Sequence, residues 1–312
     1  VEFLIHYREM KQKTIRDSFV IEGIALHTGL NIRLKANPAP INHGIIIRRT
    51  DLEGQPTIEA IAENVGYTVR GTVLMNDQMQ VSTIEHAMAA FFAAGIDNCL
   101  FEVDGPEFPI LDGSAKLFRD KIQEVGIEVQ DATKDFITIT EEIEYKTESG
   151  SVIKAYPADK LELEVMIGFD SAVLREQTAS LDDLKDFNAK TASARTFVFV
   201  REIEPLLNMN LIKGGDLKNA IVIYDKIMPQ EWIDMLTEKL HQPRVDANKL
   251  GYLNGGIKFE NEPAMHKLLD LVGDLALVGR PIKGRIIAKY PGHKINTEFA
   301  QLLRKTFITE KK

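Results

Sequence analysis

The order of strand-like and helix-like segments constrains the fold of this chain more than any other feature. Both halves begin with strand-like runs and continue into helical patterns, at about 84–94, 114–124, 262–278 and 295–307. The first helix is expected to be capped by Ser82 or Thr83 and to stop at Gly95. Strands followed by helices in each half favour α+β layers over a doubly wound sheet.

A charged segment that contains Gly126, residues 125–136, is the best candidate for a linker between two domains. The length of 312 residues suits two cores better than one. We therefore predict an N-terminal α/β domain over 1–128 and a C-terminal α/β domain over 129–312. Residues 1–9, before Met10, are treated as an upstream extension. The polar stretch 171–194 is predicted to be a loop with a short helix.

Charge and cysteine content exclude several classes of protein. The chain has 38 Lys and Arg against 46 Asp and Glu, so a generic nucleic-acid binder is disfavoured. The single cysteine, Cys99, rules out an internal disulfide and multi-cysteine metal clusters. No apolar run approaches the roughly 20 residues of a membrane span, and the first residues are too short and charged for a signal peptide. We expect a cytoplasmic protein with no membrane span and no nucleic-acid partner.

Two predicted helices carry residue types that could bind a metal. His266 and Asp270 are four residues apart, so both project from one helix face, and Asp274 continues that stripe. Glu85 and His86 stand together on an otherwise apolar, alanine-rich helix. A solvated helix face explains the first group equally well, and a wet surface turn explains the second. If the two groups meet between the halves, two His, one Asp and a nearby Glu form the inventory of a hydrolytic zinc site.

His293 lies in a turn between a strand and the last helix, where exposure is more common than catalysis. If the turn folds back over the helix at 262–278, Asp274 could reach His293 and raise its pKa.

Several longer motifs, spread over most of the chain, make the sequence recognisable. They are Gly23 to Gly29, Val81 to His86, Gly95 to Asn98, Pro109 to Ala115, Ala194 to Phe197, His266 to Leu275, and Gly292-His293. With these motifs the chain resembles the zinc-dependent UDP-3-O-acyl-N-acetylglucosamine deacetylases of lipid A biosynthesis. The resemblance implies two similar two-layer α/β sandwich domains packed face to face, with the active site between them.

The resemblance also implies a metal and a set of roles. One Zn²⁺ per chain, with Fe²⁺ as the alternative, would be bound by His86, His266 and Asp270. Glu85 would be the general base. The remaining catalytic residues would be His293, which Asp274 holds as a cationic stabiliser and general acid, and Thr196, which would hydrogen-bond the developing oxyanion.

Substrate contacts follow from the same resemblance. An inserted strand–helix–strand unit at about 198–226 would form a hydrophobic passage for the acyl chain, while residues 229–258 look like extra length. The substrate-binding residues would be Lys267 near the polar head, Phe197 by the entrance, Ile203, Leu206 and Leu207 along the passage, and Phe169. A core-packing role fits the last three equally well.

The implied activity is that of a metal-dependent amidohydrolase acting on a linear amide. It would remove the N-acetyl group from UDP-3-O-(3-hydroxyacyl)-N-acetylglucosamine, a UDP-linked acylated glucosamine, to give the free amine and acetate. This is the committed step of lipid A biosynthesis, and the family expectation is a monomer. The alternatives are a zinc amidase with another substrate, a non-catalytic binding module that kept the fold, and a protein whose His and Asp residues are structural.

Overall fold

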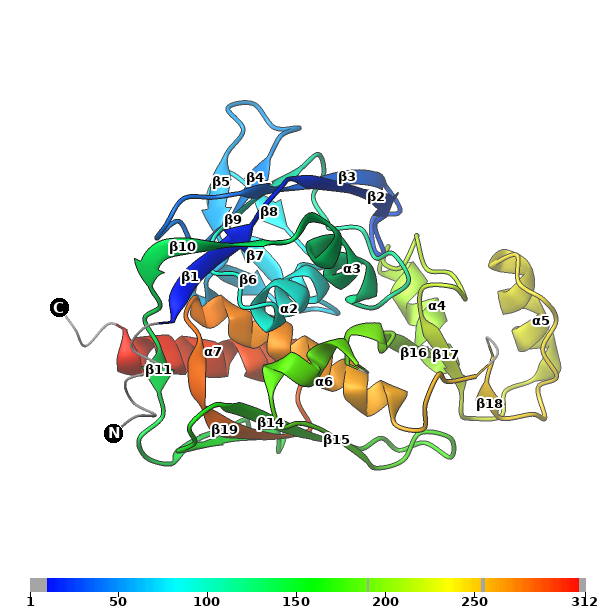
Figure 1. Ribbon diagram of the computed structural model, residues 1–312. Coiled ribbons are helices and arrows are strands. Elements are labelled where there is room, and N and C mark those ends of the chain that lie inside the picture. The colour runs from blue at the N-terminus through cyan, green and yellow to red at the C-terminus, as the bar shows by residue number, and fades with distance from the viewer. Residues whose placement is uncertain (1–9, 190, 254–255, 309–312) are drawn as a thin grey trace.

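The computed structural model describes residues 10–189, 191–253 and 256–308. Two sheets form the outer layers, and the long helices of both halves lie between them (Figure 1). Residues 1–9, the expected extension, lie outside the described residues. The α+β architecture with two packed α/β halves is therefore confirmed.

The first half contains a five-stranded sheet with the order β2-β3-β9-β4-β5. Its pairing of β4 with β9 is parallel, and the other three pairings are antiparallel. The bounds are β2 Phe19–Ile24, β3 Asn31–Pro38, β4 Ile45–Arg49, β5 Thr57–Glu59, β9 Cys99–Val103, α2 Glu85–Ala93 and α3 Lys116–Val125.

The second half repeats this topology strand for strand. The order is β12-β13-β19-β14-β15, again with one parallel pairing, β14 with β19, in the corresponding place. A short strand, β11 (Ile137–Thr138), adds to β19. The bounds are β12 Ile143–Lys146, β13 Val152–Tyr156, β14 Leu161–Ile167, β15 Gln177–Leu181, β19 Ile282–Lys289, α6 Glu262–Leu275, 3-10 helix η4 Ala276–Val278 and α7 His293–Phe307.

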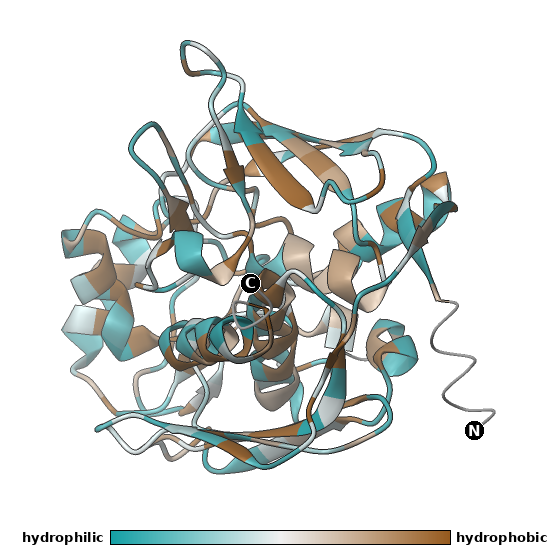
Figure 2. Cartoon of the chain, turned by 90° about the vertical axis from the view of Figure 1, so that its left-hand side faces the viewer, coloured by the Kyte–Doolittle hydropathy of each residue, from teal (hydrophilic) through white to brown (hydrophobic). Residues whose placement is uncertain are grey.

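Alternating burial explains why the sheets cover the helices on one face only. In β14 every second residue from Leu161 to Ile167 is buried, the pattern of a strand with one face on a core. Hydrophobic residues accordingly gather on the helices at the centre of the molecule (Figure 2). The core thus lies between the two sheets.

Helices α2 and α6 approach unusually closely at the centre of this core. A Cβ atom on Gly273 would stand 2.2 Å from the backbone oxygen of Glu85, so only glycine permits this contact. Small residues on α2, Ala87 and Ala90, are fully buried. The close approach brings the candidate site residues of the two halves together.

Each half carries an insertion between its fourth strand and its first long helix. In the first half this is the 3-10 helix η1 Ala62–Asn64 and a small sheet of β6 Val65–Tyr67, β7 Val73–Met75 and β8 Gln80–Val81. In the second half the insertion contains the 3-10 helices η2 Leu184–Asn188 and η3 Thr191–Ser193, and then β16 Phe197–Phe199, α4 Val200–Asn208, β17 Ile221–Tyr224, α5 Gln230–Lys239 and β18 Gly251–Tyr252.

The expected strand, helix and strand at about 198–226 are β16, α4 and β17. The described residues of the following stretch, 229–258, belong to the same unit, because β18 pairs with β17 and α5 packs into the apolar cluster around α4. This α4–α5 unit projects to one side of the molecule (Figure 1).

The strand β10 (Ile127–Thr133) pairs with β1 (Lys11–Ile15) and spans the predicted linker. No helix among the described residues is long and apolar enough to cross a membrane.

Two local predictions were wrong. The stretch 171–194, predicted to be a loop with a short helix, contains strand β15. This strand forms because it pairs with β14 at the edge of the sheet. Thr83 does not cap α2: Ile84 precedes the helix, and the Thr83 hydroxyl instead donates to Glu107 at 3.0 Å. A long-range partner therefore outcompetes the local capping bond.

Candidate active site

Three candidate metal ligands converge where α2 and α6 touch. His266 Nε2 lies 3.4 Å from Asp270 Oδ1, and His86 Nε2 lies 4.0 Å from the same oxygen. One ligand atom from each residue falls within 4.8 Å of the others, and all three side chains are buried. His86 comes from the first turn of α2, whereas the other two lie one turn apart on α6.

The surroundings of these residues fit a bound cation. The Ala194 carbonyl lies 3.0 Å from His266 Nδ1 and can only accept, so this nitrogen donates and leaves Nε2 free to bind a metal. Asp270 Oδ1 is buried without a hydrogen-bond partner among the described residues, which is costly unless a ligand satisfies it. Two imidazoles and a carboxylate are a donor set typical of zinc sites that keep an open position.

The protonation states favour metal binding. Burial, together with neighbouring His266, lowers the pKa of His86 to about 3, so its imidazole is neutral. Burial also lowers the pKa of His266. Burial alone would raise the pKa of Asp270, but His266 and Lys267 outweigh it and hold the pKa well below its usual range. Neutral imidazole and ionised carboxylate are the forms that bind metals.

Glu85, the first residue of α2, is placed as a proton acceptor. Its Oε2 accepts a hydrogen bond from the backbone amide of Thr72 at 3.2 Å. Burial raises the pKa of Glu85 to about 7; His293 opposes this shift, and the carboxylates of Asp270 and Asp274 add to it. A carboxylate with a pKa near neutrality suits general base catalysis.

His293 is the first residue of α7 and faces the same centre. Its Nδ1 lies 2.9 Å from Asp274 Oδ2, while its Nε2 lies 3.8 Å from Glu85 Oε1 and 3.9 Å from Asp270 Oδ2. Burial alone would lower the pKa of His293, but Asp274, followed by Asp270 and Glu85, outweighs it and raises the pKa to about 9. His293 is therefore cationic at neutral pH.

Two further residues, missed in the sequence, hold this cluster together. The Thr72 hydroxyl donates to Asp274 Oδ1 at 2.6 Å and lies 3.3 Å from His293 Nδ1. The Asn296 amide donates to Asp274 Oδ2 at 2.9 Å. Asn296 stands three residues after His293 on a predicted helix, a spacing that could have identified it. Nothing in the sequence sets Thr72 apart.

Lys267 and the aromatic residues lie at the edge of the cluster. Lys267 Nζ is 2.8 Å from Asp270 Oδ2 and 5.6 Å from the centre of the Phe197 ring. Phe169 packs against Phe197, with ring centres 5.7 Å apart. Thr196 is held through its backbone, whose amide donates to Gly113 O at 2.7 Å. Its oxyanion role stays a prediction.

An apolar cavity of about 250 Å³ lies in the α4–α5 unit. Thr196 and Phe197 are among the residues that line it, and they stand two and three residues after Ala194, whose carbonyl contacts His266. Ile203 and Leu206 line its wall. Leu207 packs in the apolar cluster of the same unit, and Phe169 packs behind Phe197, so both lie next to the lining.

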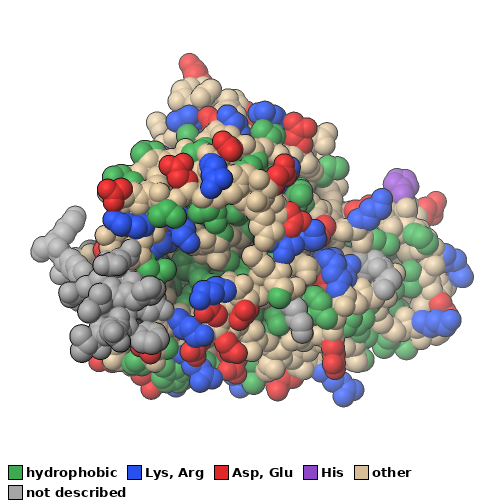
Figure 3. Space-filling model, in the orientation of Figure 1, with side chains coloured by type: hydrophobic (Ala, Val, Ile, Leu, Met, Phe, Trp, Pro, Cys, Tyr) green, Lys and Arg blue, Asp and Glu red, His purple; other side chains and the backbone are tan. Residues whose placement is uncertain are grey.

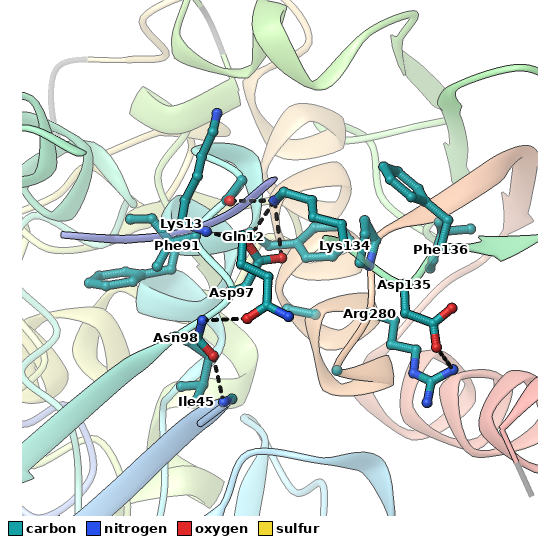
Figure 4. Close-up of a pocket in the computed structure, with 18 of the residues that line it drawn as sticks. Gln12, Lys13, Ile45, Phe91, Asp97, Asn98, Lys134, Asp135, Phe136 and Arg280 are labelled. Carbon is teal, nitrogen blue, oxygen red and sulfur yellow. Dashed lines mark hydrogen bonds and ion pairs between the residues drawn. The ribbon is translucent and has the colours of Figure 1, made fainter. Parts of the chain in front are cut away.

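A larger hollow of about 850 Å³ opens between the two sheets on the face shown in Figure 3. Its charged side chains include paired groups: Lys134 Nζ contacts Asp97 at 2.8 Å, and Arg280 contacts Asp135 at 2.6 Å (Figure 4). The described lining contains none of the predicted site residues. We therefore place the candidate chemistry at the α2–α6 contact and the adjoining apolar cavity.

Comparison with known proteins gives a consistent answer. The family model described as UDP-3-O-acyl N-acetylglycosamine deacetylase matches residues 12–241 and 240–305. The bifunctional enzyme LpxC/FabZ of Bacteroides thetaiotaomicron is 55% identical over 95% of this chain and 65% of its own length. The protein with the same name from Porphyromonas gingivalis is 52% identical over 95% of the chain and 64% of its own length.

The chain thus spans slightly less than two thirds of these bifunctional relatives. A shorter relative, the UDP-3-O-acyl-N-acetylglucosamine deacetylase of Marinobacter nauticus, is 36% identical over 95% of this chain and 90% of its own length. With a family model matched along most of its length and relatives well above 30% identity, this chain belongs to the UDP-3-O-acyl N-acetylglycosamine deacetylase family.

Proposed function

We propose that this chain is a zinc-dependent hydrolase that removes the N-acetyl group from UDP-3-O-(3-hydroxyacyl)-N-acetylglucosamine. The observation that carries the proposal is the meeting of Glu85 and His293 beside the His86, His266 and Asp270 cluster. A base, a cation and three metal donors in one buried place are the groups that a metal-assisted amide hydrolysis uses.

The chain's own residues supply the proton transfers. When bound, Zn²⁺ would polarise the acetamide carbonyl and lower the pKa of a water molecule. Glu85 accepts the proton of the attacking water. His293, which Asp274 keeps protonated, stabilises the negative charge that develops on the carbonyl oxygen and then donates a proton to the leaving amine. The Thr196 hydroxyl adds a hydrogen bond to that oxygen. The products are acetate and a free amine.

The cavity and the edge of the cluster support the choice of substrate. The 3-O-acyl chain enters the apolar cavity past Phe197 and lies along Ile203 and Leu206. Lys267 contacts the polar head of the substrate. We infer that the chain acts as a cytoplasmic monomer with one Zn²⁺, with Fe²⁺ as the alternative metal, and that it has no nucleic-acid partner.

Acetate release from the proposed substrate tests this function. The protein is assayed as purified, after chelation, and after zinc or ferrous iron is added back. Release that chelation abolishes and zinc restores supports reaction, substrate and metal together. Folded, metal-loaded protein that releases no acetate would overturn the proposal and direct attention to another amide substrate.

A further inference from the structure

The apolar cavity has a second wall outside the strand–helix–strand segment predicted to form a passage. On α5 and at its C-cap, the residues Ile233, Leu236, Thr237 and Leu240 all line the cavity. The last three follow Ile233 by three, four and seven positions, which places all four residues on one face of the helix. The opposite face is solvent-exposed, with Met235 at 53% exposure. Helix α5 therefore turns its apolar face toward the cavity and toward α4.

Polar contacts fix the distance between the two walls. Trp232 Nε1 donates to Glu204 Oε2 at 3.0 Å and thereby ties α5 to α4. Gln230 Nε2 donates to the carbonyl of Val245 at 2.9 Å and holds the segment that follows α5. The described residues of 242–245 also line the cavity. Side chains of residues 233–245 thus form one wall of the cavity, and these contacts set its distance from α4.

The position of the cavity connects α5 to the chemistry. Phe197 lines the cavity and its ring centre lies 5.6 Å from Lys267 Nζ at the edge of the cluster, whereas α5 lies on the far side of α4 from α6 (Figure 1). An alkyl chain that enters past Phe197 meets α4 and α5 together. Each methylene group that leaves water there adds about fourfold to the binding constant.

We propose that α5 is a specificity-determining wall of the acyl site, with Leu236 and Ile233 setting the length of acyl chain that the enzyme prefers. This inference rests on the proposed function. The ligand class is an alkyl chain, because the side chains that α4 and α5 contribute to the cavity are aliphatic apart from Thr237.

The test measures kcat/KM for a series of UDP-3-O-acyl-N-acetylglucosamines with acyl chains of increasing length. In the unchanged protein kcat/KM is expected to rise by about fourfold per methylene until the cavity is filled. In Leu236→Trp the rise should stop at a shorter chain, so that turnover of the longest chains falls tenfold or more while the shortest stay within twofold. Met235→Trp, on the exposed face of the same helix, is the matched control and should keep the original profile.

A second variant and a second readout keep the test decisive. Ile233→Phe narrows the same cavity if Leu236→Trp loses activity toward every chain length. Binding of the deacetylated product, followed by calorimetry, should show the same loss for long chains without any turnover. An unchanged length profile in both cavity variants would overturn the role of α5 but leave the deacetylase proposal intact. Absence of turnover for every substrate in the unchanged protein would overturn the proposed function instead.

Discussion

The two halves of the molecule share one topology but have specialised through different insertions. Each half has four strands, a helix, a fifth strand beside the third, and a final helix. The insertion after β5 carries Thr72 and contacts the catalytic cluster, whereas the insertion after β15 carries the apolar cavity. The repeated scaffold thus brings the candidate site residues together, while one insertion adds a hydrogen bond to them and the other adds an apolar cavity.

The first prediction removes the ligand that both halves share. Asp270→Ala should abolish metal binding. Activity should fall by more than about 10³-fold, because loss of a single proton-transfer group alone typically costs about 10²–10⁴-fold. Asp270 Oδ1 is the atom that faces both His266 and His86. Metal content by elemental analysis and the thermal transition are measured together. Stoichiometric zinc in this folded variant would show that the ligand set is wrong.

The second prediction separates the base, Glu85, from the three metal ligands. Glu85→Gln keeps the shape of the side chain but removes its proton affinity, so kcat should fall about 10²–10⁴-fold while bound metal stays unchanged. Turnover and metal content measured on one preparation check this. Near-normal turnover would assign the base to another residue.

The third prediction tests the insertion after β5. Thr72→Val removes the hydroxyl that bridges Asp274 and His293, and kcat should fall about 10–100-fold, as expected for a residue that orients catalytic groups. Thr72→Ser retains the hydroxyl and should restore most of kcat, with KM little changed in either variant. If the Ser and Val variants are equally impaired, the hydroxyl has no positioning role.

The fourth prediction concerns the attachment of the insertion after β15. Buried Glu262, at the start of α6, accepts hydrogen bonds from Arg195, the residue before Thr196. Burial alone would raise the pKa of Glu262, but Arg195 and the Lys258 amide outweigh it and lower the pKa.

Because the folded-state pKa is the lower one, this stabilisation is present above the unfolded pKa of about 4.3 and is lost as the pH falls through the folded value. Glu262→Gln should lower the free energy of unfolding by about 2 kcal/mol at neutral pH. Urea unfolding at pH 7 and at pH 4 checks the sign: the difference between the two proteins should shrink at the lower pH. A constant difference would show that ionisation of Glu262 does not contribute.

Much of the site could be predicted because it is encoded in helical spacing. The long periodic pattern over 262–278 made the helix itself predictable. Because His266 and Asp270 are four residues apart, they share one face of that helix wherever it packs. Glu85 and His86 were conspicuous because an apolar helix rarely carries such residues unpaired. The proposed reaction came from the resemblance to a known family, since spacing alone was equally consistent with His266 and Asp270 lying on a solvated helix face.

Other features depend on contacts between residues far apart in the chain. Thr72 meets Asp274 across 202 positions, so no local pattern could single it out. Strand β15 is polar on its outer face, and pairing with β14 rather than its own composition makes it a strand. The cavity wall on α5 likewise depends on tertiary structure, because the apolar face of α5 lines the cavity only where it packs opposite α4.

The sequence alone therefore determined the layered α+β class, the positions of the main helices and the chemical types available to the site. These follow from periodicity and from side-chain chemistry, which are local properties. Only the tertiary structure decided that His293 Nε2 lies 3.8 Å from Glu85 Oε1 and that α4 and α5 line one cavity. Those distances depend on how α2 and α6 pack, and Gly273 permits that approach only in the folded chain.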